Sequence, residues 1–408
     1  MRKTIWICLL FLSACAATMQ SHLDSIQNDF ANGNFAKATQ DSDFKNKNNL
    51  DLLIDATALF HENKFSESDA AFEEFNKRNI NETSSSVSRE AAGLLFGNSV
   101  NSYKPYMMDS LFVSYYQIWN LLALNDWSNA RVVINQSYNR QQKMSLEYKK
   151  LIEENKNKLS NIPQIEDKVN KNKSDWAAFS DIMNPALMYL SGIYFLNDGD
   201  FATAETYLKR ANGMMPNNTF IQQDLELAQK HTKPKNTTWI FYESGFAPRL
   251  RQEDFSLFLP KLGMIYFTVS EPYFNNAPTQ PKNSQILADV DKMFLTEFNE
   301  YRVNEILRTY TSTVAKTAVQ ATMYNSHSDS APLLGILSTI YTVSSSNADV
   351  RTWATLPKYI YVQRIDNDKS DLNELNIGDS IKTKPKGNNV IYVRQHDKIT
   401  DTKIIKLK

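Results

Sequence analysis

The fold is decided by residues 184–216, whose sequence is NPALMYLSGIYFLNDGDFATAETYLKRANGMMP. Asn184 is a favourable helix N-cap, and Pro185 suits the first helical position. Residues 197–200 (Asn-Asp-Gly-Asp) predict a turn, and a second helix is expected to follow it and to stop before Pro216. The stretch therefore predicts a helical hairpin.

Small and apolar residues recur through this stretch at helical spacing. Gly192 and Ala204 let two antiparallel helices approach closely, while Phe195 and Leu208 fill the space beside them. Gly213 stands where a helix C-cap is expected. The stretch resembles a tetratricopeptide (TPR) repeat at six positions: Gly192, Phe195, Ala204, Leu208, Ala211 and Pro216. A tight helical hairpin of another kind is the alternative.

Three earlier turns repeat this pattern of a turn, an aromatic residue and, three residues later, a small residue. They lie at Asn32-Gly33-Asn34-Phe35 with Ala38, at Asn63-Lys64-Phe65 with Ser68, and at Asn125-Asp126-Trp127 with Ala130. The spacing between copies is uneven, and other hairpins are expected between them, for example at residues 89–106. We therefore expect an irregular TPR-like α-solenoid over residues 22–235.

Two segments of this helical half stand out by their composition. Residues 140–173 are charged around a thin stripe of leucines, which predicts a long solvated helix with a break near Pro163. The other segment is an aromatic cluster made of Tyr103, Tyr106, Met107, Met108, Phe112, Tyr115, Tyr116 and Trp119. Helical spacing favours core packing for this cluster, and an aromatic wall lining a peptide groove is the alternative.

The composition changes near residue 235, and β-branched and aromatic runs follow. Strands are predicted at residues 237–242, 264–270, 286–290, 359–364, 380–383, 389–394 and 403–407. Residues 366–376 are predicted to form a polar loop. We expect residues 236–408 to form a second, smaller α+β domain with antiparallel strands in a small sheet or sandwich.

A helical insertion is expected to interrupt these strands. Apolar residues recur every three or four positions from residue 297 to residue 325, and a second apolar segment covers residues 332–343. The insertion is interpreted as a helical hairpin packed on the sheet. Alternatively, its apolar face meets another subunit, a partner or the membrane surface.

The N-terminus predicts where the protein resides. Arg2 and Lys3 precede an apolar run over residues 5–12, as in a secretory signal. Leu12-Ser13-Ala14-Cys15 resembles a bacterial lipobox, which implies a signal peptide at residues 1–14, acylation of Cys15 and a lipidated tether over residues 15–21. A plain signal peptide with a chance cysteine is the alternative. Because Ala16 rather than Asp follows, resemblance to enterobacterial sorting implies the outer membrane.

Charge, cysteine content and the absence of long apolar runs limit what the chain is expected to bind and how it attaches to a membrane. The chain has 45 basic and 45 acidic residues, so nothing global predicts nucleic acid as a partner. The two cysteines are Cys8 and Cys15, so the mature chain would carry no free thiol if Cys15 is acylated. Past residue 16 no apolar run approaches the ~20 residues of a membrane-spanning helix. The acyl chains on Cys15 are therefore the expected link to the membrane.

Two further segments carry a resemblance to a family. They are Tyr242-Glu243-Ser244-Gly245-Phe246-Ala247-Pro248 and Ala348-Asp349-Val350-Arg351-Thr352-Trp353-Ala354-Thr355-Leu356-Pro357. Together with the lipobox and the helical half they resemble an uncharacterised family of Gram-negative TPR-containing outer-membrane lipoproteins. Members are commonly encoded near a lipoprotein that activates a penicillin-binding protein, which implies an envelope role. From the residues alone, Trp353 and Leu356 are core residues, Pro357 sets the entry of a strand, and Arg351 holds a carboxylate or a carbonyl.

The sequence predicts a protein that is not an enzyme. It contains no His-Glu-x-x-His zinc motif, phosphate-binding glycine loop or Gly-x-Ser-x-Gly elbow, so no catalytic, cofactor-binding or metal-binding residue is assigned. We expect a lipid-anchored periplasmic scaffold that binds envelope-biogenesis proteins, including the peptidoglycan-synthesis machinery, through its TPR-like surface. The alternative is a subunit of a homo-oligomer assembled through residues 297–343. An envelope hydrolase is the third hypothesis, because carboxylate pairs from distant positions form no local motif.

Overall fold

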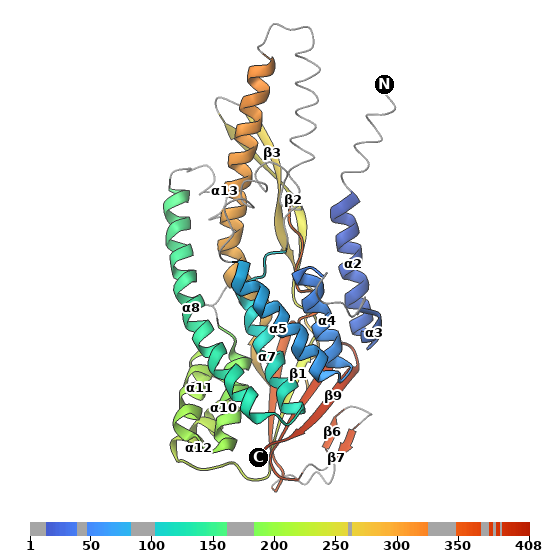
Figure 1. Ribbon diagram of the computed structural model, residues 1–408, viewed down its shortest axis with the longest axis vertical. Helices are drawn as coiled ribbons and strands as arrows, with labels where there is room; N and C mark the ends of the chain where they lie inside the picture. Colours follow the sequence, from blue (N-terminus) through green and yellow to red (C-terminus); the bar gives the residue numbers. More distant parts are fainter. Residues whose placement is uncertain are drawn as a thin grey trace.

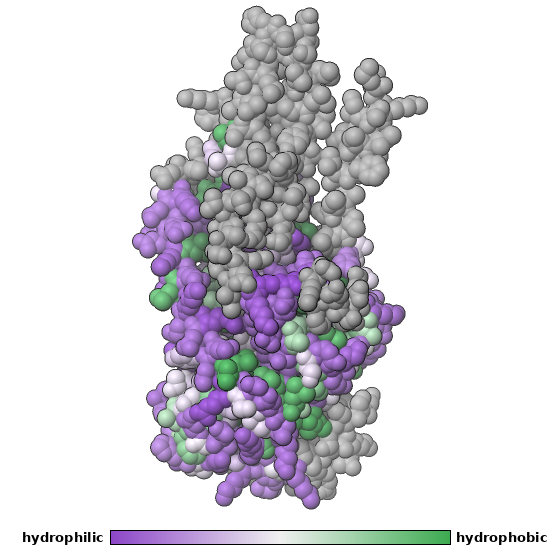
Figure 2. Space-filling model, viewed as in Figure 1, coloured by the Kyte–Doolittle hydropathy of each residue, from purple (hydrophilic) through white to green (hydrophobic). Residues whose placement is uncertain are grey.

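The computed structural model describes residues 14–38, 47–82, 103–160, 183–259, 263–324, 348–368, 375–377, 381–383 and 386–408. Figure 1 shows an elongated molecule with helical hairpins packed beside a central sheet at one end. The long helices α8 and α13 and the two-stranded β2–β3 ribbon extend from this body toward the other end. On the face shown in Figure 2, the coloured residues are mostly hydrophilic, and the hydrophobic ones form small patches.

Among the described residues the N-terminal half is helical, and short turns join several of its successive helices. Their bounds are α2 (Ala14–Ala31), α3 (Phe35–Ala38), α4 (Asn49–His61), α5 (Phe65–Glu82), α7 (Met107–Ala123), α8 (Trp127–Leu159), α10 (Pro185–Asp198), α11 (Phe201–Met214) and α12 (Thr219–Gln229). The predicted cap of α10 is confirmed, because the Asn184 side chain accepts a hydrogen bond from the backbone nitrogen of Leu187 at 3.1 Å.

Four helical turns share one backbone geometry, and they are the four that the sequence pattern picks out. In each, a residue with positive φ stands two positions before the aromatic residue that begins the next helix. These residues are Gly33 (φ 75°), Asn63 (φ 62°), Asn125 (φ 58°) and Gly199 (φ 87°). Glycine and asparagine tolerate this left-handed conformation best. The small residue that follows each aromatic is buried, as expected: Ala38, Ser68, Ala130 and Ala204.

The close approach of α10 and α11 depends on Gly192. A Cβ atom added there would lie 2.6 Å from both Cγ and Cδ2 of Leu208, so only glycine fits without displacing that side chain. The hairpin predicted from the sequence is thus confirmed. One detail was wrong: Gly213 lies within α11 and does not cap it, since the cap residue is Met215.

The C-terminal half contributes a five-stranded mixed sheet in the order β4-β5-β1-β8-β9. The strands are β1 (Thr237–Ser244), β2 (Arg249–Leu259), β3 (Gly263–Tyr273), β4 (Gln285–Asp289), β5 (Tyr359–Asp366), β6 (Leu375–Ile377), β7 (Ile381–Thr383), β8 (Asn389–Gln395) and β9 (Ile399–Lys406). The expectation of antiparallel strands throughout was wrong, because β1 and β8 pair in parallel. The remaining pairs, β2–β3 and β6–β7 included, are antiparallel.

All seven predicted strands occur, with ends shifted by a few residues. Two strands were missed. β2 carries several charged residues in its first half, and β6 lies in the segment expected to be a polar loop. β2 finds its partner in β3, and the two strands form a separate ribbon.

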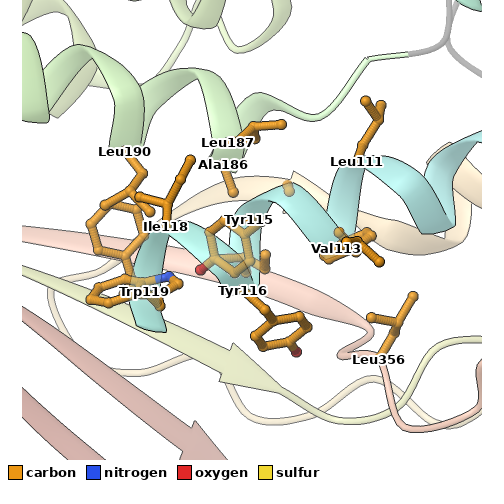
Figure 3. Packing of buried hydrophobic residues seen from close by; sticks show 14 of the residues in the cluster. Leu111, Val113, Tyr115, Tyr116, Ile118, Trp119, Ala186, Leu187, Leu190 and Leu356 are labelled. Carbon is orange, nitrogen blue, oxygen red and sulfur yellow. The ribbon is translucent and has the colours of Figure 1, made fainter. Parts of the chain in front are cut away.

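One hydrophobic core spans the helices and one face of the sheet. Trp119 on α7 packs against Phe241 of β1 and Tyr392 of β8, with ring centroids 5.4 Å apart in both cases. Figure 3 shows Tyr116 and Trp119 on the side of α7 nearer the strands, with Leu187 and Leu190 of α10 on the other side. The core interpretation of the aromatic cluster is therefore confirmed. Residues on both sides of the expected domain boundary at 235 belong to this core.

The opposite face of the sheet forms a second, smaller cluster. It contains Ile240, Tyr242, Tyr361, Ile365, Ile391 and Val393. The central strand β1 is consequently buried on both faces, which suits its continuous run of aromatic and β-branched residues.

The long helix α13 (Val290–Tyr324) packs inside the molecule along its first half. Val303, Ile306 and Leu307 join Phe267 of β3 and Leu159 of α8 in one buried cluster. This part of the insertion thus packs within the chain, while residues 325–343 lie outside the described ones. The charged segment after residue 140 continues α8 to Leu159, and the break expected near Pro163 also lies outside them. Among the helices described, none is long and apolar enough to cross a membrane.

Candidate functional site

Cys15 is the one site residue predicted from the sequence. It is the second residue of α2, so the backbone of the expected tether, residues 15–21, is helical. Residues 1–13 of the expected signal peptide lie outside the described residues. Nothing in the fold tests acylation of Cys15, which stays a prediction.

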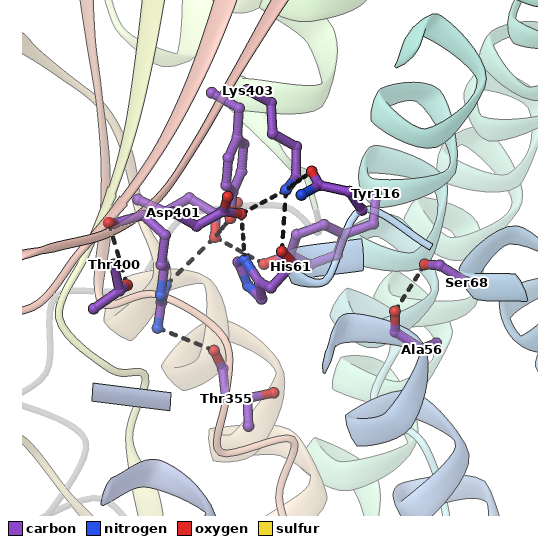
Figure 4. Close-up of polar contacts among 12 residues, drawn as sticks. Ala56, His61, Ser68, Tyr116, Thr355, Thr400, Asp401 and Lys403 are labelled. Carbon is purple, nitrogen blue, oxygen red and sulfur yellow. Dashed lines mark hydrogen bonds and ion pairs between the residues drawn. The ribbon is translucent and has the colours of Figure 1, made fainter. Parts of the chain in front are cut away.

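The sequence did not predict a group of buried polar residues between the helices and the sheet. We call the first part the Glu243 network, made of Tyr116, Glu243, Tyr392 and Arg394. Figure 4 shows Tyr116 of this group close to His61, Asp401 and Lys403 of the second part. Glu243 lies near the end of β1, directly after the run Trp-Ile-Phe-Tyr at residues 239–242. Its Oε2 accepts hydrogen bonds from the hydroxyl of Tyr116 at 2.8 Å and from that of Tyr392 at 2.7 Å. One carboxylate therefore joins α7 to two strands.

Arg394 of β8 neutralises this carboxylate. Its Nη1 lies 3.4 Å from Oε2 of Glu243, and both side chains are almost fully buried. Its Nη2 donates to the backbone oxygens of Gly245 at 3.0 Å and Thr355 at 3.2 Å. Burial raises the pKa of Glu243, while Arg394 and the two tyrosine hydroxyls act in the opposite direction. The guanidinium thereby ties the end of β1 to the segment before β5.

A second group, the His61 network, adjoins the first and contains His61, Asn63, Asp401 and Lys403. Nδ1 of His61, at the end of α4, lies 2.9 Å from Oδ2 of Asp401 on β9. Nζ of Lys403 lies 2.7 Å from the same oxygen and donates to Oδ1 of Asn63 at 2.9 Å. The turn between α4 and α5 is thereby bound to the edge strand of the sheet.

A histidine paired with an aspartate can act as a general base when its other nitrogen reaches a substrate. The surroundings of His61 do not favour this role. Its ring is stacked on Phe35 at 4.4 Å and contacts Phe30 and Phe60 edge-on, and the side chain is fully buried. Burial lowers the pKa of His61 to about 4, so the ring is neutral at physiological pH. Nε2 has no hydrogen-bond partner among the described residues.

A third buried carboxylate, that of Asp224, also joins helices to strands, at the other end of the sheet. Asp224 of α12 accepts hydrogen bonds from the Tyr189 hydroxyl at 2.6 Å, from Nε1 of Trp239 at 2.7 Å and from Nε of Arg364 at 2.8 Å. These donors lie on α10, β1 and β5. Aspartate and glutamate are seldom fully buried unless paired, so such carboxylates indicate fixed joints between elements.

The segment at residues 348–357 occupies a structural position. Arg351 holds Asp349 through two contacts, Nε to Oδ1 at 2.7 Å and Nη2 to Oδ2 at 2.6 Å, as predicted for a carboxylate partner. Trp353 and Leu356 are buried, as expected. Nε1 of Trp353 donates to Oγ1 of Thr57 on α4 at 3.2 Å. This segment therefore joins the N-terminal helices to the start of β5.

Sequence signals for these networks exist but are weak. Glu243 and Arg394 are single charged residues within apolar strands, which is unusual for a buried strand. Asp401 and Lys403 alternate on an edge strand, as surface charges also do. Their partners lie more than a hundred residues away in most cases, so pairing could not be deduced from spacing. Comparisons with known protein families, curated proteins and solved structures gave no match for this chain.

Proposed function

We propose that this chain is a lipid-anchored scaffold that holds other envelope proteins at the periplasmic face of the outer membrane. The lipobox at Cys15 supports the anchor. The buried networks support a mechanical role, because they connect each group of helices to one sheet and so make the body rigid. A rigid body on a lipid anchor keeps its partners at high local concentration near the membrane.

The repeated turns support a TPR-like origin for the helical half, but the inner face of the array is already occupied. In TPR proteins the first helix of each hairpin lines a concave surface that is open to partners. Here α4, α7 and α10 are buried almost throughout, and the chain's own sheet packs against them. A partner would therefore bind an outer helix rather than a groove. Because the sheet covers the inner face of the helices, we place the binding surface for a partner on the outside of the array.

The outer side of α8 is the surface best suited to a partner. Val132 and Leu146 are 49% and 62% exposed. They are separated by fourteen residues, almost four helical turns, and so lie on nearly the same side of the helix. We propose these two exposed apolar side chains as the contact points for a partner. By the family resemblance, proteins of peptidoglycan synthesis are the first candidates for the partner.

Crosslinking in intact cells tests the proposal. A photoreactive residue at position 146 should trap an envelope protein that the same residue at Lys209, an exposed position on α11, does not trap. Labelled palmitate should enter the wild-type chain and not a Cys15→Ser variant. Recovery of only lipids and abundant porins at both positions would contradict the scaffold, and an unlabelled wild-type chain would contradict the anchor.

A further inference from the structure

A hydroxyl group on β3 links the long helix α13 to the segment that precedes β5. Ser270 of β3 is buried, and α13 runs beside the β2–β3 ribbon (Figure 1). The Oγ atom of Ser270 lies 2.8 Å from Oε1 of Glu305 on α13. It also lies 2.8 Å from the backbone oxygen of Asp349. Three separate stretches of the chain therefore meet at one oxygen atom.

The hydrogen atoms at this oxygen are too few for an ionised Glu305. A serine hydroxyl carries one hydrogen, and the backbone oxygen of Asp349 can only accept. Both contacts of Oγ are full hydrogen bonds only if the hydroxyl donates to Asp349 and a protonated Oε1 of Glu305 donates to Ser270. The other carboxyl oxygen, Oε2, accepts from the backbone nitrogen of Ser270 at 3.2 Å. The geometry thus requires a proton on Glu305.

The charges around Glu305 agree with a protonated carboxyl group. Arg302, about one turn earlier on α13, pairs with Glu271 of β3 and not with Glu305. Asp349 brings a second carboxyl group, and the Tyr106 phenol faces the same region from the start of α7. Burial is the largest influence and raises the pKa of Glu305 to about 7. Asp349 acts in the same direction, while Arg302 and the two hydrogen bonds from β3 oppose it.

We propose that the contact between Glu305 and Ser270 is a pH-sensitive switch, whose protonated form holds α13 on β3 and on the segment before β5. When the proton leaves, the Ser270 hydroxyl can serve only one of its two acceptors. Either Glu305 or the backbone oxygen of Asp349 then loses its donor, and the carboxylate has no paired cation. The contact is therefore firm in acid and weaker at neutral pH. The inference depends neither on the scaffold function nor on the lipid anchor.

The direction of the pH effect follows from the number of protons bound. The folded carboxyl group of Glu305 has a pKa of about 7, whereas local opening of α13 would return it to its ordinary value of 4.5. Between these values the closed form keeps a proton that the open form has released. The equilibrium constant for opening should rise by up to about tenfold per pH unit across this window and no further above it. Glu297 and Asp109 add slopes of the same sign, so a variant is needed to isolate Glu305.

Substitution of Glu305 by glutamine tests the proposal in the full chain. The amide nitrogen in Glu305→Gln can donate to Oγ of Ser270, and the amide oxygen can accept from the Ser270 backbone, so the variant imitates the protonated acid at every pH. Hydrogen exchange of peptides from α13 and β3, corrected for the intrinsic exchange rate, gives the opening constant. Infrared spectra of chains with isotope-labelled glutamate report protonated glutamate carboxyl groups. Glu226→Gln, at an exposed position on α12, is the control for loss of a carboxyl group.

In the expected result the wild type shows one protonated glutamate carboxyl more than Glu305→Gln at about pH 6. The opening of α13 also rises less steeply with pH in Glu305→Gln, by up to about tenfold per pH unit. Identical infrared spectra of the two chains at that pH would overturn the proposal, because Glu305 would then be ionised in the folded state. The same slope of opening in both chains would also overturn it. So would a Glu305→Gln chain that does not fold, because an amide should replace a neutral acid at this position without loss.

Discussion

The carboxylate of Glu297, on α13, accepts a hydrogen bond from the backbone nitrogen of Met108 at 3.0 Å, and its other oxygen accepts one from Met107. These nitrogens belong to the first turn of α7, so a side chain of one helix caps the start of another. A helix N-terminus favours a carboxylate, yet complete burial disfavours its charge. Burial prevails and raises the pKa of Glu297 to about 8.

We therefore predict that Glu297 makes the folded state less stable as pH rises. The folded pKa lies above the ordinary value, so the folded chain holds this proton through a range in which the unfolded chain has released it. The contribution to the free energy of unfolding falls by up to about 1.4 kcal/mol per pH unit between roughly pH 5 and pH 8. In Glu297→Gln this contribution to the pH slope should be absent. Urea unfolding at several pH values measures the difference between the two proteins.

The neighbouring carboxyl groups set the background for that measurement. Burial also raises the pKa of Asp109 to about 7 and that of Glu305 to about 7, so both retain a slope of the same sign in the variant. Glu226→Gln, at an exposed position on α12, controls for loss of a carboxylate. If the free energy of unfolding changed with pH in parallel for wild type and Glu297→Gln, the raised pKa of Glu297 would be contradicted.

His61 should make the folded state less stable as pH falls, which is opposite to the effect of Glu297. Because its folded pKa is about 4, the unfolded chain takes up a proton between about pH 6.5 and pH 4 that the folded chain refuses. Stability is therefore lost as pH falls through that window, again by up to about 1.4 kcal/mol per pH unit. His61→Gln keeps a donor for Asp401 and should remove this loss. His231→Asn, at an exposed position with positive φ, is the control for loss of a histidine.

Two glycines offer a matched pair of substitutions in one hairpin. Gly192→Ala places a Cβ against Leu208 and should destabilise the chain by about 1–3 kcal/mol, because the space is already filled. Gly213→Ala meets no atom within 4 Å and should stabilise it by about 0.5–1 kcal/mol through helix propensity. Thermal unfolding of both variants measures this. Equal stabilisation by the two substitutions would mean that the helices do not approach as closely as described.

These two glycines also show which structural features could be predicted from the sequence. Gly192 was predicted to allow close approach, because its spacing from Ala204 and Leu208 is a local pattern within thirty residues. The caps and left-handed turns were predictable for the same reason: a residue such as Asn184 or Gly199 acts on its immediate neighbours. Gly213 misled the interpretation because an exposed glycine inside a helix and a glycine at its end look alike in sequence.

The long-range features could not be predicted in this way. The parallel pairing of β1 with β8 brings together segments about 150 residues apart, and neither strand encodes its neighbour. Glu243 and Arg394 were visible as charges in apolar strands, but nothing in their spacing showed that they face each other. β2 was missed because alternating charge near Arg251 reads as a loop until β3 supplies a partner.

The last prediction concerns the Glu243 network as the joint between helices and sheet. Glu243→Leu leaves the Arg394 guanidinium buried without its partner and should destabilise the chain by about 3–5 kcal/mol. Adding Arg394→Met removes the unpaired charge, so the double variant should be more stable than the sum of the single effects implies, by about 0.5–3 kcal/mol. Urea unfolding of all four proteins gives this coupling energy. The exposed pair Glu73–Lys77 on α5 provides a control cycle in which coupling should be close to zero, because water screens both charges. If the Glu243 cycle were additive as well, the two charges would act independently, and the attachment of α7 to the sheet would have to come from the aromatic contacts of Trp119 instead.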